Sequence, residues 1–212
     1  MESNQDIFDK LTEAESLSVD DIIIPITFEP FSYIVVQELK KLKNRRERNS
    51  LYESIFNDER ALVLNESSCA KTTMFSNHKT NDEYWQETKE MAFAMNETGY
   101  DVCFLPEIGD DLKGTQRADA IIRINGIWRI ADFKYFHSTN DNTLTGDLLK
   151  GFQQASTIVL KVQNADAGIL REAIEYLKRK KIRFGDLVLM NEYNKIVILQ
   201  PHHLKSEKYK YL

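Results

Sequence analysis

Two short runs of mainly apolar residues lie close together between residues 117 and 135. Branched apolar residues dominate positions 120–124 and 127–131, on either side of the dipeptide Asn125-Gly126. Asn-Gly between two such runs is the strongest short-range signal for a two-residue β-hairpin turn. This segment is therefore predicted to form two antiparallel strands that are joined at Asn125-Gly126.

The predicted hairpin gathers charged side chains on one patch. Side chains alternate between the two faces of a strand, so Asp132 and Lys134 point to the same face and Phe133 points to the other. Asp119 is expected roughly opposite Asp132, because about six residues separate each of them from the turn. Two carboxylates and one ammonium group should therefore converge.

Paired carboxylates beside a lysine suit metal-assisted cleavage of phosphodiester bonds. Mg²⁺ prefers carboxylate oxygens and keeps several of its waters, and the bound cation lowers the pKa of such a water. Lys134 would hold the water or neutralise charge that builds on the phosphate. The alternative is a solvated cross-strand ion pair without chemistry, and the hairpin alone leaves both interpretations open.

Helical and strand patterns alternate on both sides of the hairpin. A helix with an apolar stripe is predicted before Gly99, which should end it. The later pattern predicts a strand over 100–105, a helix over 148–156, a strand over 158–162, a helix over 169–181 and strands over 186–190 and 195–199. This order predicts an α/β protein.

The first third of the chain has a different pattern. Apolar spacing predicts a helix over 33–42 with a basic flank at 40–48, then a helix over 52–64 and a polar linker over 65–81. We therefore expect a mainly helical region at 1–75, of unknown role, and a second domain at 76–212. The basic flank could contact nucleic acid or be a solvated helix surface.

Composition narrows the class of protein only slightly. The formal net charge is −5, which excludes a strongly basic nucleic-acid coat but still allows a local basic face around a cleft. Two cysteines are too few for a disulfide framework or a thiolate metal site, so a reducing compartment is expected. The pattern contains no signal peptide and no membrane-spanning run, which predicts a cytoplasmic protein with no membrane partner.

The order of elements and the placement of acids resemble the PD-(D/E)xK nuclease superfamily. Within it, the chain looks most like the C-terminal nuclease domains of contact-dependent growth-inhibition and related polymorphic toxins, many of which act on tRNA. The resemblance covers roughly the last 130 residues and is carried by 90–92, 99–102, 105–107, 118–120, 128, 132–134, 154–155 and 159–160. It implies a restriction-endonuclease-like fold, in which a mixed central sheet is flanked by helices.

The resemblance also implies roles for individual residues. Asp119 and Asp132 would ligate Mg²⁺ or Mn²⁺ together with the backbone carbonyl of Phe133, and Lys134 would position water or neutralise charge. Two departures from the family pattern affect this assignment. Arg117-Ala118 stands where a proline often precedes the first acid, and the second acid is Asp, whose reach is shorter than that of the commoner Glu.

Two more residues are assigned by the same resemblance. Glu90, on the predicted helix before Gly99, would complete the acidic metal site, and Gln154 would orient the substrate or a site carboxylate. Glu90 could equally be a helix-surface charge, with Glu87 or Glu107 serving in its place. Gln154 could simply pack against the sheet.

The implied function is a metal-dependent endonuclease that is toxin-like or associated with a mobile element. Its substrate would be tRNA, another RNA or DNA, and an immunity protein is a candidate partner. A catalytically inactive module that binds nucleic acid or protein on the same scaffold is the main alternative. In a third hypothesis, residues 22–64 dock a partner through the predicted helix at 33–42.

Overall fold

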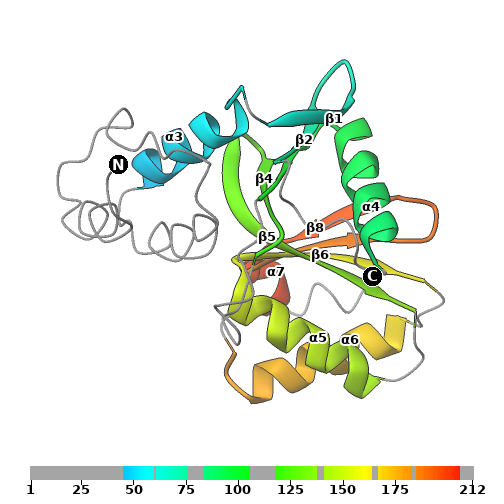
Figure 1. Ribbon diagram of the computed structural model, residues 1–212. Coiled ribbons are helices and arrows are strands. Elements are labelled where there is room, and N and C mark those ends of the chain that lie inside the picture. Colours follow the sequence, from blue (N-terminus) through cyan, green and yellow to red (C-terminus); the bar gives the residue numbers. More distant parts are fainter. Residues whose placement is uncertain are drawn as a thin grey trace, which may run out of the picture.

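The computed structural model describes residues 45–59, 61–75, 84–105, 118–137, 141–163, 167–182 and 185–205. Within these residues, eight strands form one mixed sheet in sequence order, whose arrangement can be followed in Figure 1. They are β1 (Leu62–Glu66), β2 (Lys71–Met74), β3 (Asp101–Phe104), β4 (Ala120–Ile124), β5 (Ile127–Phe136), β6 (Thr157–Val162), β7 (Asp186–Met190) and β8 (Ile196–Leu199). The β2–β3, β5–β6 and β6–β7 pairs are parallel, and the others are antiparallel.

Helices cover both faces of this sheet. The described helices are α3 (Arg45–Phe56), α4 (Trp85–Glu97), α5 (Asp141–Gln154), α6 (Ala167–Arg179) and α7 (Pro201–Lys205). The side of the sheet that carries Phe133 packs against α4, whereas the side that carries Phe136 packs against α5 and α6. Figure 1 shows α5 and α6 next to each other below the sheet, with α4 away from them. The predicted α/β architecture, a mixed sheet flanked by helices, is confirmed.

The central strands are buried on both faces because helices lie above and below them. All five residues of β4 except Arg123 are buried, and so are Ile158, Val159 and Leu160 of β6. Such strands read as continuous apolar runs, which is how the sequence identified them. A charged residue in this layer, such as Asp132, is therefore an exception that requires a partner.

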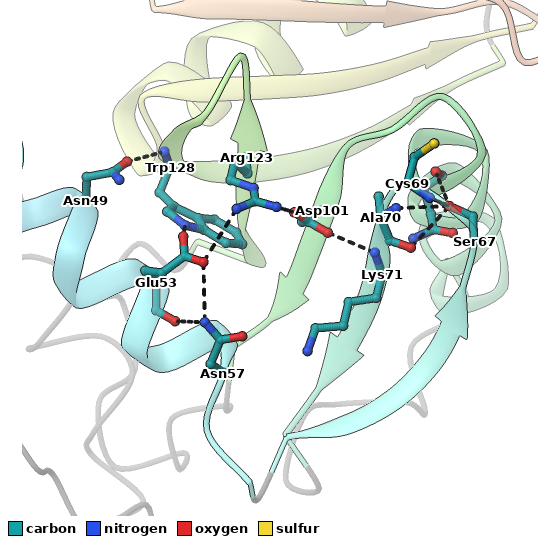
Figure 2. A network of polar contacts seen from close by, with 11 residues as sticks. Asn49, Glu53, Asn57, Ser67, Cys69, Ala70, Lys71, Asp101, Arg123 and Trp128 are labelled. Carbon is teal, nitrogen blue, oxygen red and sulfur yellow. Dashed lines mark hydrogen bonds and ion pairs between the residues drawn. The ribbon is translucent and has the colours of Figure 1, made fainter.

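Helix α3 packs on the sheet through an apolar stripe and a polar network. Its Leu51 and Ile55 join the same core cluster as Ile121 of β4. The side chain of Asn49 accepts a hydrogen bond from the backbone N–H of Trp128 at 2.8 Å. As Figure 2 shows, the Glu53 carboxylate accepts from the indole N–H of Trp128.

The network continues from α3 across three strands of the sheet. Arg123 forms ion pairs with both Glu53 and Asp101. Asp101 in turn accepts from the backbone N–H of Lys71 at 2.8 Å (Figure 2). Because the Asp101 side chain is buried, it needs these donors, and α3 is thereby tied to β2, β3 and β4.

Two predictions for the first third of the chain are wrong. The helix expected over 52–64 is the second half of α3, which begins at Arg45 and ends at Phe56. The side-chain amide of Asn57 donates to the Glu53 carbonyl at 2.9 Å and satisfies an acceptor at the end of the helix. Residues 62–64 then form part of β1 rather than the end of a helix.

The segment predicted as a linker over 65–81 contains the end of β1 and all of β2. Its polar residues make a tight turn, in which Ser67 Oγ accepts from the backbone N–H groups of Cys69 and Ala70. Strand β2 pairs with β3, so the described part of the sheet already includes residues 62–74. Whether residues 1–75 form a unit of their own stays a prediction, because 1–44, including the helix expected at 33–42, lie outside the described residues.

Among the described residues, no helix combines the length and the apolar character that crossing a bilayer requires.

Candidate active site on the central hairpin

The hairpin forms with the predicted turn and register. Asn125 and Gly126 both have positive φ, at 52° and 73°, as a two-residue hairpin turn of this type requires. The ladder runs from Ile124 opposite Ile127 to Ala120 opposite Ala131. One step beyond its end, the backbone N–H of Asp119 donates to the Ala131 carbonyl at 3.1 Å, which brings Asp119 level with Asp132.

Asp119 is fixed against the second strand through its side chain as well. Its Oδ2 accepts a hydrogen bond from the backbone N–H of Phe133 at 2.6 Å. Since Phe133 lies between Asp132 and Lys134 in the chain, this bond holds the half-buried Asp119 carboxylate beside both. The position follows from the register, because a shift by one residue would turn Asp132 and Lys134 to the other face.

Asp132 and Lys134 form an ion pair on the face of the sheet that α5 covers. Asp132 Oδ2 lies 2.7 Å from Lys134 Nζ. The two residues are two positions apart on β5 and therefore share one face. Asp132 is only 1% exposed, so its carboxylate is separated from bulk water and depends on Lys134 for a counter-charge.

Burial and the neighbouring acid shift the protonation equilibrium of this cluster. Burial, followed by repulsion from Asp119, raises the pKa of Asp132 from 3.8 to about 7, although Lys134 opposes the shift. For Lys134, burial lowers the pKa, but attraction to Asp132, Asp119 and Asp147 outweighs it, and the pKa is raised. Lys134 is therefore charged near neutral pH, while Asp132 is poised between its two forms.

We refer to Asp119 and Asp132 together as the acid pair. Helix α5 lies directly over Asp132. A Cβ added to Gly151 would come within 2.9 Å of Asp132 Oδ2. Asp147, one turn earlier on the same helix face, contributes to the electrostatic field at Lys134. Gln154 follows on the same stripe and has a buried side-chain oxygen. The structure thus places Gln154 on the helix that covers the acid pair, whereas its functional role stays a prediction.

Sequence reasoning missed Asp147 and Gly151. A glycine in the interior of a helix costs roughly 1 kcal/mol relative to alanine, so it indicates that something approaches the backbone closely. Asp147 precedes Gly151 by four residues and therefore shares its helix face. Together these two features were the available signal, but only the folded structure shows which side chain lies beneath them.

A pair of glycine substitutions in α5 tests this close approach. Alanine has a higher helix propensity than glycine, but Gly151→Ala should not be more stable for that reason. Its methyl group would lie 2.9 Å from Asp132 Oδ2 and from Ile158. Gly146→Ala is the matched control, since nothing lies within 4 Å of a Cβ there. We expect Gly146→Ala to raise the free energy of unfolding by up to about 1 kcal/mol. Gly151→Ala should be roughly 1–3 kcal/mol less stable than that control. Equal stabilities in urea denaturation would contradict the close contact.

The glutamates of α4, which were expected to complete the metal site, are not grouped with the acid pair. Glu90 is exposed and accepts a hydrogen bond from Gln86 at 3.1 Å. Glu87 faces inward with a buried Oε2 that no described residue contacts by a hydrogen bond. Within the described ranges, no group of three or more His, Cys, Asp or Glu side chains is arranged to hold a metal ion. Glu107 lies outside the described residues.

The pH dependence of stability should report the state of Asp132. The folded state binds its proton more tightly than the unfolded state, so the stability that this group contributes is present below about pH 4 and is lost as pH rises through about 7. The slope approaches roughly 1.4 kcal/mol per pH unit. Asp132→Asn should remove this slope and gain stability relative to the wild type from pH 5 to 8. Urea denaturation across that range, with Glu90→Gln as the control, measures it, and parallel profiles would contradict the raised pKa.

The fold and site together define an α/β protein with two close carboxylates and an ammonium group on a central hairpin. No family model and no curated protein matches the chain. Among solved structures, it is similar to a CdiA-CT/CdiI toxin and immunity complex from Burkholderia pseudomallei, with 20% sequence identity and a TM-score of 0.42. The match covers 58% of this chain and 89% of that one.

Proposed function

We propose that the chain is a metal-dependent endonuclease that hydrolyses phosphodiester bonds of nucleic acid at Asp119, Asp132 and Lys134. The observation that carries the proposal is the convergence of these three groups. Asp132 Oδ2 lies 2.7 Å from Lys134 Nζ, and Asp119 is held beside them by the N–H of Phe133. Their types and order along the hairpin are those of the nuclease superfamily that the sequence resembles.

The donor set fits Mg²⁺ or Mn²⁺. Mg²⁺ is usually bound through one or two carboxylates, with waters and substrate phosphates completing its coordination, so a third protein acid is not required. Burial, and after it repulsion from Asp119, raises the pKa of Asp132, and a divalent cation held by these carboxylates would offset the repulsion. Gly151 supports the same assignment, because any larger residue at that position would fill the space against Asp132 Oδ2.

The bound cation would supply a water of lowered pKa and neutralise charge on the phosphate. In this proposal, Asp119 and Asp132 hold the cation, and the Lys134 ammonium lies beside the phosphate to stabilise the negative charge that develops in the transition state. The carboxylates of Asp132 and Asp119, with a smaller contribution from Asp147, keep Lys134 protonated. Glu90 and its alternative Glu87 lie on α4, on the other face of the sheet, and have no part in this arrangement.

Purified protein should be incubated with total tRNA and with plasmid DNA, each in Mg²⁺, Mn²⁺ or EDTA. We expect cleavage of at least one polymer with Mg²⁺ or Mn²⁺ and none with EDTA, because the two carboxylates alone cannot activate water. The two substrates separate RNA from DNA, which phosphate chemistry does not distinguish. Absence of cleavage under every condition would reject the proposal. A toxin role with an immunity protein as partner is part of the proposal, on the sequence resemblance alone.

A further inference from the structure

A hollow of about 590 Å³ lies beside the acid pair, between α3, the start of β5, the end of α5 and the start of β7. This volume is within the usual range for small-molecule sites. Its walls combine cationic, amide, hydroxyl and aromatic side chains. The lining residues that carry the argument are Arg48, Phe152, Gln153, Ser156, Arg129 and Asp186.

The hollow and the acid pair share one face of the sheet. Ile130 lines the hollow, and Asp132 is the next residue of β5 on that face, roughly 7 Å further along the strand. The same helix spans both, since Gly151 covers Asp132 and Gln153 lines the hollow. Stacked bases of one strand are spaced by about 3.4 Å. A ligand chain with its phosphate at the acid pair would therefore reach the hollow with a neighbouring nucleotide.

Most of the polar groups in the walls already have structural partners. Arg129 is ion-paired with Asp186 and donates to the carbonyls of Ile124 and Ile127 at 3.1 and 3.0 Å. Ser156 Oγ donates to the Ile130 carbonyl at 3.2 Å. These contacts fix the floor and the rim of the hollow, so it is a built cavity rather than a gap between loose side chains.

Of the two described cations that line the hollow, Arg129 is paired with Asp186 and Arg48 is the candidate for binding a ligand. It is half-buried and forms no ion pair with a carboxylate of the described residues. Its guanidinium lies near Tyr52, where it opposes the rise in the phenol pKa that burial causes. Arginine binds phosphate through paired N–H donors. The position of Arg48 is fixed because α3 is anchored to β5 through Asn49 and Glu53 (Figure 2).

The aromatic wall is provided by Phe152, which is half-buried and lines the hollow. Trp128 also lines the hollow and packs on Phe56, with 4.7 Å between the ring centroids. A flat ring that stacks on Phe152 and a phosphate that meets Arg48 are the two halves of a nucleotide. An apolar ligand would leave Arg48 without a partner in a partly desolvated wall.

We propose that this hollow is the subsite for one nucleotide unit of the strand that is cut at the acid pair. Arg48 binds a phosphate of that unit and Phe152 stacks on its base. This inference rests on the proposed endonuclease function. It adds that the substrate is bound as an unpaired strand or loop, because a base within a duplex cannot enter a cavity of this kind.

Binding of a fluorescein-labelled eight-nucleotide single-stranded RNA and of its DNA counterpart, in EDTA, tests the subsite without cleavage. Arg48→Ala should weaken binding of at least one of them about tenfold, the size expected for one charge-assisted contact. Phe152→Leu keeps an apolar side chain in place and removes the aromatic face, so it should weaken binding by a similar factor. Unlabelled 5′-AMP or 5′-UMP should compete for the site in the wild type.

Lys89→Ala is the control, because it changes the net charge as Arg48→Ala does and lies on α4 across the sheet. It should bind both strands like the wild type. Wild-type affinity in both Arg48→Ala and Phe152→Leu, with circular dichroism unchanged, would overturn the subsite. If the wild type then still cleaved nucleic acid with Mg²⁺, the proposed endonuclease function would be retained without the subsite. Binding that depends on both residues, without cleavage under any metal, would reject the endonuclease and keep the subsite.

Discussion

Asp132→Asn is expected to lower metal-dependent cleavage by more than about a hundredfold. Removing a residue that only hydrogen-bonds to a metal ligand already costs roughly 10- to 100-fold in activity, and loss of the ligand itself should cost more. The amide keeps the size of the side chain but cannot supply an anionic oxygen to the cation. The rate of cleavage at saturating Mg²⁺, on whichever of tRNA and plasmid DNA the wild type cuts, measures this effect. Asp119→Asn should behave in the same way.

The stability of the Asp132→Asn variant shows whether a loss of cleavage is chemical or results from unfolding. Asn at 132 removes a buried carboxylate whose pKa is raised, so the variant should be at least as stable as the wild type above pH 7. Loss of cleavage would then not be a consequence of unfolding. Glu90→Gln is the control and should retain cleavage, since Glu90 is exposed and away from the pair. Full cleavage by Asp132→Asn would remove the acid pair from the chemistry.

Lys134→Ala is a less informative variant. It would leave the Asp132 carboxylate buried without its counter-charge, and breaking a buried pair from one side costs roughly 3–5 kcal/mol. The remaining carboxylates, Asp119 and Asp147, would add to this cost. Reduced cleavage in Lys134→Ala would therefore combine a chemical and a structural effect.

Gly185→Ala should destabilise the protein more than alanine at Gly126, Gly146 or Gly151. A Cβ at residue 185 would lie 1.9 Å from the carbonyl oxygen of Ser156 and 2.7 Å from its carbon, and both atoms belong to the backbone. The contact is located where β6 and β7 start, and the backbone N–H of Asp186 donates to the same carbonyl at 3.1 Å. Neither strand can yield without breaking the pairing between them.

We expect Gly185→Ala to lower the free energy of unfolding by more than about 3 kcal/mol, or to prevent folding, as measured by urea denaturation. Gly126→Ala is the control: its φ of 73° is unfavourable for alanine, but nothing lies within 4 Å of the added atom. That strain alone should cost roughly 1–2 kcal/mol. A loss of stability in Gly185→Ala no larger than that of the control would show that the backbone can move at this point.

Local signals in the sequence were sufficient for most elements between α4 and β8, although α5 begins at Asp141 rather than near residue 148 and the short helix α7 was not predicted. Asn125-Gly126 specified both the turn and its register, because the dipeptide accepts positive φ at two successive positions. Gly99, with a φ of 88°, ends α4 for the same reason. The alternation along β5 then placed Asp132 and Lys134 on one face, and the register placed Asp119 beside them.

The polar residues near position 70 led to a wrong prediction of a linker. Thr72 and Thr73 read as part of a linker because they are short and polar, yet both are buried in β2. That strand exists because β3, from a distant part of the chain, pairs with it in parallel. Pairing with a distant segment leaves no periodic signal in β2 alone, so β2 could not be predicted from local pattern, and β1 is in the sheet only through its pairing with β2.

The sequence by itself determined the central hairpin, the helix and strand order that follows it, and the meeting of Asp119, Asp132 and Lys134, because each depends on turn chemistry and on the alternation of side chains within a few residues. Only the tertiary structure decided what surrounds them: α5 with Gly151 and Asp147 above the acid pair, Glu90 in solvent, and the hollow beside Arg48. These features arise where separate helices pack on the sheet, and the angle and depth of such packing depend on the whole core rather than on any one segment.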